Sequence, residues 1–172
     1  LLTLPLAGLT AQSAEIRRVE EATLVFEEIT AIPEKSVPDF LLRDARALVI
    51  VPGLLKAGFV VGGEFGRGVL LTRQESGGWS NPVFVTLSGG GIGFQAGIRS
   101  TDLLLVFRTD RGVNGVLRGD LTLGVDLAAA AGPVGRQARA STDMELKAEI
   151  YSYSRSRGFF AGLSLDGSVL AV

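Results

Sequence analysis

Residues 47–63, ALVIVPGLLKAGFVVGG, decide the fold class of this chain. The run is almost wholly apolar, but it is shorter than the roughly 20 residues that a membrane-spanning helix needs. Pro52, Gly53, Lys56 and Gly58 also interrupt it. We therefore expect a buried strand, a turn and a second strand here, and no transmembrane helix.

Strand signals continue downstream of this run. Residues 68–73 and 83–88 flank a loop that contains Gly77 and Gly78, which predicts a hairpin with a longer connection. The apolar residues 103–107, the alternating residues 121–127 and the segment 159–169 predict further strands. The chain has 23 glycines, so we expect a sheet that bends sharply or brings backbones close together.

Residues 147–157 alternate in a more specific way. Serine, alanine and isoleucine fall on one face of the predicted strand, and this small face would allow another layer to approach closely. The opposite face carries the larger polar side chains, which are Glu149, Tyr151, Tyr153, Arg155 and Arg157.

The N-terminal region predicts helix. Apolar residues recur at helical spacing between residues 14 and 30, with glutamates between them, and a short helix is expected before residue 47. The chain is therefore predicted to be an α+β domain with a strongly curved, mainly antiparallel sheet or partial barrel, covered by N-terminal helices. With 172 residues it forms one domain, which we place at residues 15–172.

Residues 1–14 have the pattern of the end of a secretory signal segment. Apolar residues lead to small ones, and Ala11 and Ser13 would occupy the small positions before a cleavage site. An ordinary apolar segment packed on the domain is the alternative. The signal pattern predicts an exported protein that is periplasmic or peripheral to the cell envelope.

Composition excludes several kinds of chemistry. The chain has no cysteine and no histidine, so the usual zinc sites, cysteine nucleophiles and Ser-His-Asp triads cannot be built, and no metal or other cofactor is expected. Residues 91–96 fit the letters of a dinucleotide fingerprint, but no strand-helix-strand unit surrounds them. The aspartates are scattered, so no catalytic set can be named and we predict no enzyme.

Charge points to a specific kind of partner. The whole chain carries a net charge of −1, and only three of its 17 basic residues are lysines. A strongly basic domain is typical of nucleic-acid binding, so we do not expect nucleic acid as a partner. Arginine favours planar, two-pronged contacts to phosphate or carboxylate groups.

Several segments together resemble a known family, the SYLF domain. They are GPVGR at residues 132–136 and SYSRSRGFFAGLSLDGSV at 152–169, with KAGF at 56–59, GRGV at 66–69, GGWS at 77–80 and Thr101-Asp102. SYLF domains are phospholipid-binding modules of fungal and animal actin-patch proteins and of many bacterial exported proteins. The resemblance implies non-enzymatic binding of anionic, phosphoinositide-like headgroups at a membrane surface.

The resemblance also implies a set of headgroup-binding residues. The set comprises Lys56, Arg67, Arg136, Tyr151, Tyr153, Arg155 and Arg157. In this interpretation the arginines hold lipid phosphates and the tyrosines sit at the headgroup level. The alternative is structural, with Arg155 buried in the sheet and paired with Asp102 or Asp126.

A scaffold that binds a protein partner is the competing hypothesis. Exposed aromatic residues such as Trp79, Phe159 and Phe160 would then form an actin-regulator-like docking patch. The leading helix is acidic, whereas some relatives bind lipid through a basic one. We therefore expect lipid affinity to be modest and to fall as salt rises.

Overall fold

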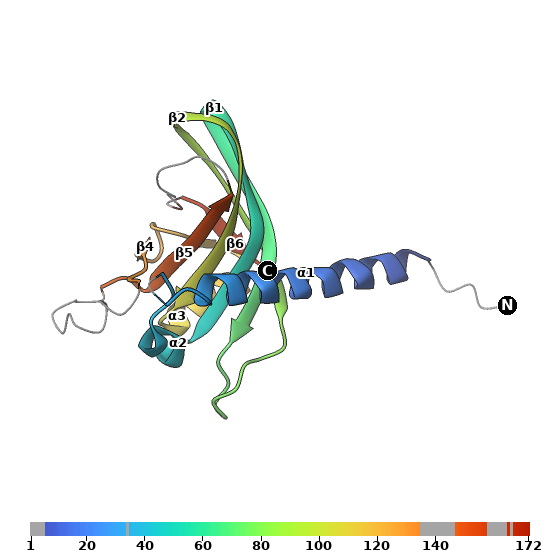
Figure 1. Ribbon diagram of the computed structural model, residues 1–172, viewed down its shortest axis with the longest axis vertical. Coiled ribbons are helices and arrows are strands. Elements are labelled where there is room, and N and C mark those ends of the chain that lie inside the picture. The colour runs from blue at the N-terminus through green and yellow to red at the C-terminus, as the bar shows by residue number, and fades with distance from the viewer. Residues whose placement is uncertain (1–5, 34, 135–146, 158–164, 166) are drawn as a thin grey trace.

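A computed structural model describes residues 6–33, 35–134, 147–157, 165 and 167–172 of the chain. Within these residues, six strands form one strongly curved sheet, and three helices accompany it (Figure 1). The helices are α1 (Leu6–Thr30), α2 (Asp39–Asp44) and α3 (Asp110–Arg118). The strands are β1 (Ala47–Thr72), β2 (Val83–Phe107), β3 (Leu121–Thr122), β4 (Ala129–Ala131), β5 (Ile150–Arg157) and β6 (Val169–Ala171).

One long antiparallel hairpin, β1 and β2, forms most of the sheet. Its pairing extends from Ala47 opposite Phe107 to Leu70 opposite Val83. The turn that we predicted at Pro52 and Gly53 is absent, because β1 continues through these residues. The backbone takes up an irregularity there instead, with Gly53 at a φ of 58° and a shift in register between Val51 and Leu54.

Glycines allow this hairpin to bend back on itself. A Cβ atom on Gly58 would lie 2.4 Å from the Cα of Gly62, so the strand can turn this sharply only because both residues lack side chains. A Cβ on Gly68 would lie 2.1 Å from the carbonyl oxygen of Ile50. The two halves of β1 therefore pack directly against each other, as the glycine content predicted.

The short strands complete the two ends of the sheet. β5 pairs with the last eight residues of β2, and β6 pairs with Thr86–Ser88 near its beginning. β3 lies beside β6, and β4 is parallel to β5, so the sheet is mixed. The predicted strand at residues 121–127 ends after Thr122, since Gly124 has a φ of 76° and Asp126 accepts a hydrogen bond from the Thr122 amide.

Two apolar clusters lie on opposite faces of the sheet. Val49, Val51 and Phe107 belong to the inner cluster, which the bent hairpin encloses. Leu48 and Ile50, which alternate with them, belong to the outer cluster beneath α1 and α2. The sheet thus separates an enclosed core from a second core that the helices cover.

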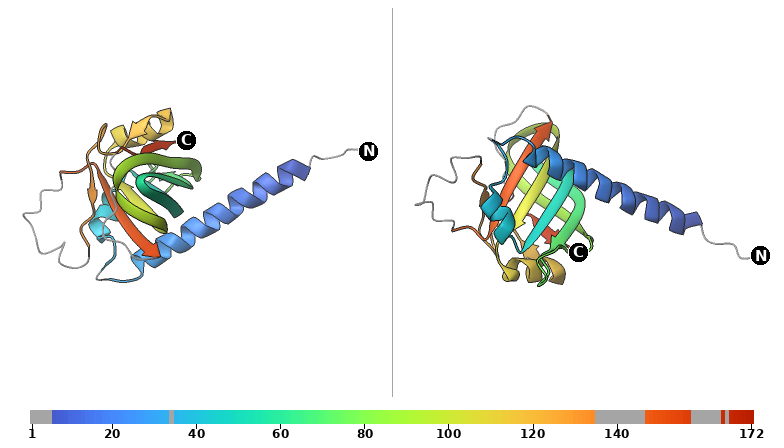
Figure 2. Two further views of the ribbon diagram at one scale, coloured as in Figure 1. Left: turned by 90° about the horizontal axis from the view of Figure 1, so that it is seen from above. Right: turned by 60° about the horizontal axis from the view of Figure 1, so that its bottom comes forward.

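Helix α1 covers only part of the outer face. Ala22, Val25 and Ile29 are buried against the sheet, whereas the first half of the helix projects beyond it (Figure 2). The helix also begins at Leu6, earlier than the periodicity indicated. Within the described residues, no helix combines the length and the apolar character needed to span a bilayer.

Candidate functional site

The bent end of the hairpin exposes large apolar side chains on its outer face. Val61 is 72% exposed and Ile98 is 81% exposed, while Leu55 and Phe65 are about half exposed. We call these four residues the hairpin patch. The patch lies at the end of the molecule opposite to α2 and α3 (Figure 1).

The inner face of the same bent end carries charge. The Nζ atom of Lys56 lies 2.6 Å from Oε2 of Glu64, and both side chains are nearly buried. Glu64 also accepts a hydrogen bond from the hydroxyl of Ser168, which precedes β6. The buried Arg99 lies opposite Lys56 in the β1–β2 register.

The bent end therefore has its charged side chains inside and its apolar side chains outside, the reverse of the usual arrangement in a protein. Lys56 and Glu64 point inward, and their neighbours Leu55 and Phe65 point outward. Lys56, which the resemblance placed at the headgroup, is instead part of an interior ion pair. Arg67 does lie on the outer face, exposed and 5.7 Å from the centre of the Phe65 ring.

Arg155 joins β5 to α1 at the surface. It forms an ion pair with Glu28 of α1, and both side chains are about half exposed. Neither of the partners that we predicted for it, Asp102 or Asp126, forms this pair. Asp102 lies opposite Arg155 in the register, but its Oδ1 atom accepts a hydrogen bond from the Gly53 amide.

The two tyrosines of β5 belong to the outer core. Tyr151 and Tyr153 are each only 5% exposed and pack among the residues beneath α1. The Tyr153 hydroxyl donates a hydrogen bond of 2.8 Å to the carbonyl oxygen of Pro133. Burial, with a smaller contribution from Tyr151, raises the pKa of Tyr153 well above its usual value.

The predicted headgroup residues that the structure describes do not gather into one surface. Arg136 and the side chain of Arg157 lie outside the described part of the chain. Trp79 is partly buried, and the guanidinium of Arg73 stacks 3.9 Å from the centre of its ring. Phe159 and Phe160, the other aromatic residues of the predicted docking patch, are outside the described residues.

Sequence reasoning missed a cluster of four arginines at the α2 end. Arg43, Arg46, Arg73 and Arg108 line a pocket of about 460 Å³, together with Asp44. They come from α2, the residue before β1, the residue after β1 and the residue after β2. No spacing in the sequence could reveal the cluster, because only the hairpin pairing brings these segments together.

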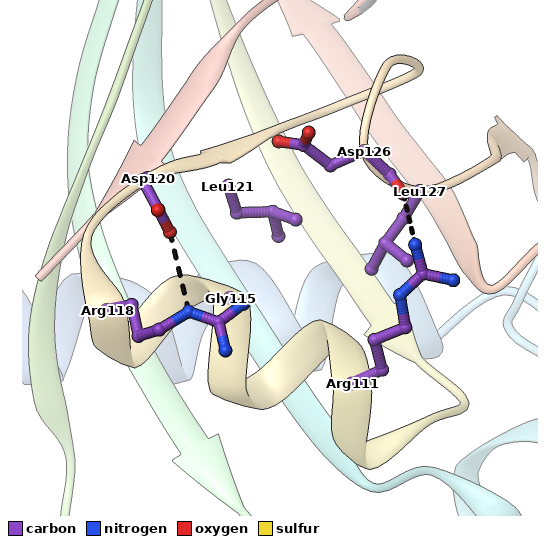
Figure 3. A pocket seen from close by; sticks show the side chains of 7 residues that line it. All are labelled: Arg111, Gly115, Arg118, Asp120, Leu121, Asp126 and Leu127. Atoms are coloured by element: carbon purple, nitrogen blue, oxygen red, sulfur yellow. Dashed lines mark hydrogen bonds and ion pairs between the residues drawn. The ribbon is translucent and has the colours of Figure 1, made fainter.

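A smaller pocket of about 180 Å³ lies between α3 and the turn after β3 (Figure 3). Arg118 lies 3.8 Å from Asp120, and Arg111 donates a hydrogen bond to the carbonyl oxygen of Asp126. Arg111 thus contacts the turn after β3, while Arg118 contacts Asp120 in the link between α3 and β3. We interpret this pocket as structural.

No group of three or more acidic side chains gathers as metal ligands would, within the residues that the structure describes. Of the aspartates considered for acid-base chemistry, Asp102, Asp120 and Asp126 make separate contacts, and Asp143 lies outside the described residues. Asp120 and Asp126 contact α3 or the turn, and Asp102 binds a backbone amide. The described residues therefore offer binding surfaces and no assembled catalytic set.

Comparison with known proteins identifies similar domains. A family model described as "Ysc84: Las17-binding protein actin regulator" matches residues 88–172. The bovine SH3 domain-containing YSC84-like protein 1 is 37% identical over 160 residues, which is 91% of this chain and 47% of that protein. The Saccharomyces cerevisiae protein YSC84 is 34% identical over 140 residues, 80% of this chain and 30% of that protein. The chain thus spans about half the length of the bovine relative and about a third of the length of the yeast relative.

Proposed function

The chain belongs to the Ysc84 (SYLF) family, and we propose that it binds anionic phospholipid headgroups at a membrane surface without catalysing a reaction. The description of the family names a binding partner and a regulatory role rather than a reaction. A binding function of this chain is consistent with that description. The lipid partner is our own inference from the bent end of the hairpin.

The reversed polarity of the bent end is the observation that supports the proposal. Val61 and Ile98 are exposed to water while Lys56 and Glu64 are nearly buried. Burying a side chain of this size in an apolar phase contributes about 1.5–3 kcal/mol. The hairpin patch can gain this free energy by inserting into the boundary between lipid headgroups and acyl chains.

Arg67 supplies the preference for anionic lipid. Its guanidinium is exposed beside Phe65, at the border of the hairpin patch. A cation near an anionic membrane surface contributes about 1 kcal/mol, and salt screens this attraction. The contact therefore combines an apolar contribution that salt leaves in place with a smaller electrostatic one.

Co-sedimentation with vesicles tests the proposal. We expect the chain to bind vesicles of phosphatidylglycerol, cardiolipin or phosphoinositide in phosphatidylcholine more tightly than phosphatidylcholine alone. Substituting Val61→Ser and Ile98→Ser should weaken binding at least about tenfold, because two inserted side chains are lost. Arg67→Gln should weaken it about fivefold and make it less sensitive to salt.

A matched control separates insertion from a general effect of removing surface valine. Val125 is 74% exposed, about as exposed as Val61 at 72%, but it lies in the turn after β3. Val125→Ser should leave vesicle binding unchanged. If the chain binds none of the anionic vesicles, or if Val125→Ser weakens binding as much as Val61→Ser, the lipid proposal is wrong.

Docking of a protein partner at the same patch is the second candidate. The family description, which names an actin regulator, favours this candidate. The name of the bovine relative, which describes a protein that contains an SH3 domain, favours it as well. Co-sedimentation with purified actin filaments provides the corresponding test. Filament binding that persists at high salt and is lost in the Val61→Ser and Ile98→Ser variant, without vesicle binding, would favour this candidate.

A further inference from the structure

We propose that the arginine pocket at the α2 end is a separate binding site for a phosphate monoester. The pocket is lined by Arg43, Arg46, Arg73 and Arg108. It lies at the opposite end of the hairpin from the hairpin patch (Figure 1), so one flat membrane cannot contact both. The inference is therefore independent of the proposed lipid contact.

Arg73 is the fixed centre of this pocket. Its Nε atom donates to the carbonyl oxygen of Ala45 at 3.3 Å, and its Nη2 atom donates to that of Leu42 at 2.6 Å. Its Nη1 atom donates to the carbonyl oxygen of Gly77 in the loop between β1 and β2. Stacked on Trp79 as well, Arg73 joins the end of α2 to this loop, and we assign it a positioning role.

The contacts of Arg73 determine where the neighbouring arginines lie. Leu42 and Ala45, whose carbonyl groups it binds, are adjacent in sequence to Arg43 and Arg46. The amide of Arg46 donates to the carbonyl oxygen of Phe107. Arg46 therefore lies close to Arg108, the residue that follows Phe107. Arg43, Arg46 and Arg108 therefore line one pocket together with Arg73, whose guanidinium the backbone holds in place.

Acidic groups do not balance this charge. Asp44 is the one carboxylate among the described residues that line the pocket. Asp110 lies 3.9 Å from Arg46, but both side chains are more than half exposed, so the pair contributes little and can exchange for another anion. Glu149 lies near Arg108, where its side chain accepts a hydrogen bond from Thr109. The pocket is thus locally cationic on a chain whose net charge is −1.

The chemistry of guanidinium groups selects the ligand. Several arginines that line one pocket offer forked donors suited to the three oxygens of a phosphate monoester, which carries a charge of about −1.5 to −2 at neutral pH. The volume of about 460 Å³ also leaves room for an organic group attached to the phosphate. The ester can belong to a soluble molecule or to a lipid headgroup, and the experiment distinguishes these sources.

An NMR titration of the full chain tests the site, with glycerol 3-phosphate as the probe and sodium chloride at equal ionic strength as the reference. We expect saturable shifts of amide signals confined to residues 43–46, 73–79 and 108–109. The double variant Arg43→Gln and Arg46→Gln should bind the probe at least tenfold more weakly. Both side chains are exposed, so the variant should melt at the temperature of the unmodified chain.

A second double variant removes the same charge elsewhere. Arg17 and Arg118 are exposed on α1 and α3 and do not line the pocket, so Arg17→Gln with Arg118→Gln should bind the probe within twofold of the unmodified chain. Equal weakening in the two double variants would refute a defined site. Shifts that sodium chloride reproduces would also refute it.

Vesicles of phosphatidic acid identify the source of the phosphate, because this lipid presents a phosphate monoester. They are tested with the Val61→Ser and Ile98→Ser variant, which lacks the hairpin patch. Binding that is then lost on adding Arg43→Gln and Arg46→Gln assigns the pocket to a lipid headgroup. Binding of glycerol 3-phosphate without binding of these vesicles assigns it to a soluble ester.

Discussion

At the scale of single residues, Gly68 lies where the two halves of β1 pack against each other. A Cβ atom there would lie 2.1 Å from the carbonyl oxygen of Ile50 and 3.0 Å from the Cα of Val51. Both of these atoms belong to the backbone, so the clash cannot be relieved by a change of rotamer. The close packing of the two halves of β1 at this point thus depends on the missing side chain of Gly68.

Gly68→Ala should therefore lower the free energy of unfolding by about 3 kcal/mol or more, because the two halves of β1 must move apart. Gly90→Ala is the matched control, since its Cβ would lie 3.7 Å from the nearest atom, the carbonyl oxygen of Gly62. We expect the control to change stability by less than about 0.5 kcal/mol. Denaturation in urea measures both, and equal losses would contradict this account of the bend.

Tyr153 makes stability depend on pH at the alkaline end. Because burial raises the pKa of the folded phenol, the unfolded chain loses this proton first, near pH 10. The stabilisation is fully present below about pH 10, and it falls as pH rises further, by up to about 1.4 kcal/mol per pH unit.

Tyr153→Phe tests this origin of the pH dependence. The variant should be less stable by about 1 kcal/mol at neutral pH, because the hydrogen bond to Pro133 is lost. Its stability should also fall less steeply than that of the unmodified chain above pH 10. Thermal melts between pH 8 and 11 measure both effects, and parallel curves would assign the alkaline loss to other groups.

At the scale of elements, α1 divides into a packed half and a projecting half. The residues that it buries are Ala22, Val25 and Ile29, while residues 10–13 are exposed. The ion pair between Glu28 and Arg155 joins the packed half to β5, but both side chains are half exposed, so it contributes at most about 1 kcal/mol. The apolar contacts of the second half therefore hold the helix.

Removing residues 1–13, as cleavage after Ser13 would, should leave the melting temperature within a few degrees of that of the full chain. A change of less than about 0.5 kcal/mol is expected, because the contacts of the packed half remain. Val25→Ala should in contrast cost about 2 kcal/mol, since the side chain is 5% exposed. A large loss on truncation would mean that the projecting half contributes to the core.

At the scale of the whole molecule, the bent hairpin separates two candidate binding sites. The hairpin patch lies at its bent end and the arginine pocket at the end near α2, with α1 crossing between them (Figure 1). The two sites share no residue. The free-energy effects of substitutions at distant, independent sites are expected to add.

We therefore expect glycerol 3-phosphate to bind equally well in the absence and presence of phosphatidylglycerol vesicles. The Val61→Ser and Ile98→Ser variant should keep its affinity for the phosphate ester within twofold, measured by calorimetry. The Arg43→Gln and Arg46→Gln variant should keep most of its binding to the same vesicles. Loss of both activities in either variant would indicate one shared site.

Much of the fold was predictable from local patterns. The apolar run at 47–63, the alternation at 147–157 and the helical spacing at 14–30 predicted strands and a helix, and these elements are confirmed, although the turn expected within the first segment is absent. The turns were less predictable. Gly53 looked like the centre of a hairpin turn and is a local irregularity in one long strand, because pairing with β2 on both sides holds β1 extended.

The candidate site was predicted less well than the fold. A strand pattern determines which residues share a face, and it grouped Tyr151, Tyr153 and Arg155 correctly. It does not determine whether that face meets water or another element. Here α1 covers the face, so the tyrosines are buried and the arginine binds Glu28.

The sequence by itself determined the class of the sheet, the family and the absence of cysteine and histidine chemistry, because all of these depend on local pattern or composition. Only the tertiary structure decided which charges face inward and which meet one another. Lys56 pairs with Glu64 because the hairpin bends between them, and Arg43 approaches Arg108 because β1 and β2 pair at their ends. Such encounters between distant residues depend on the path of the backbone through space, which no spacing along the chain specifies.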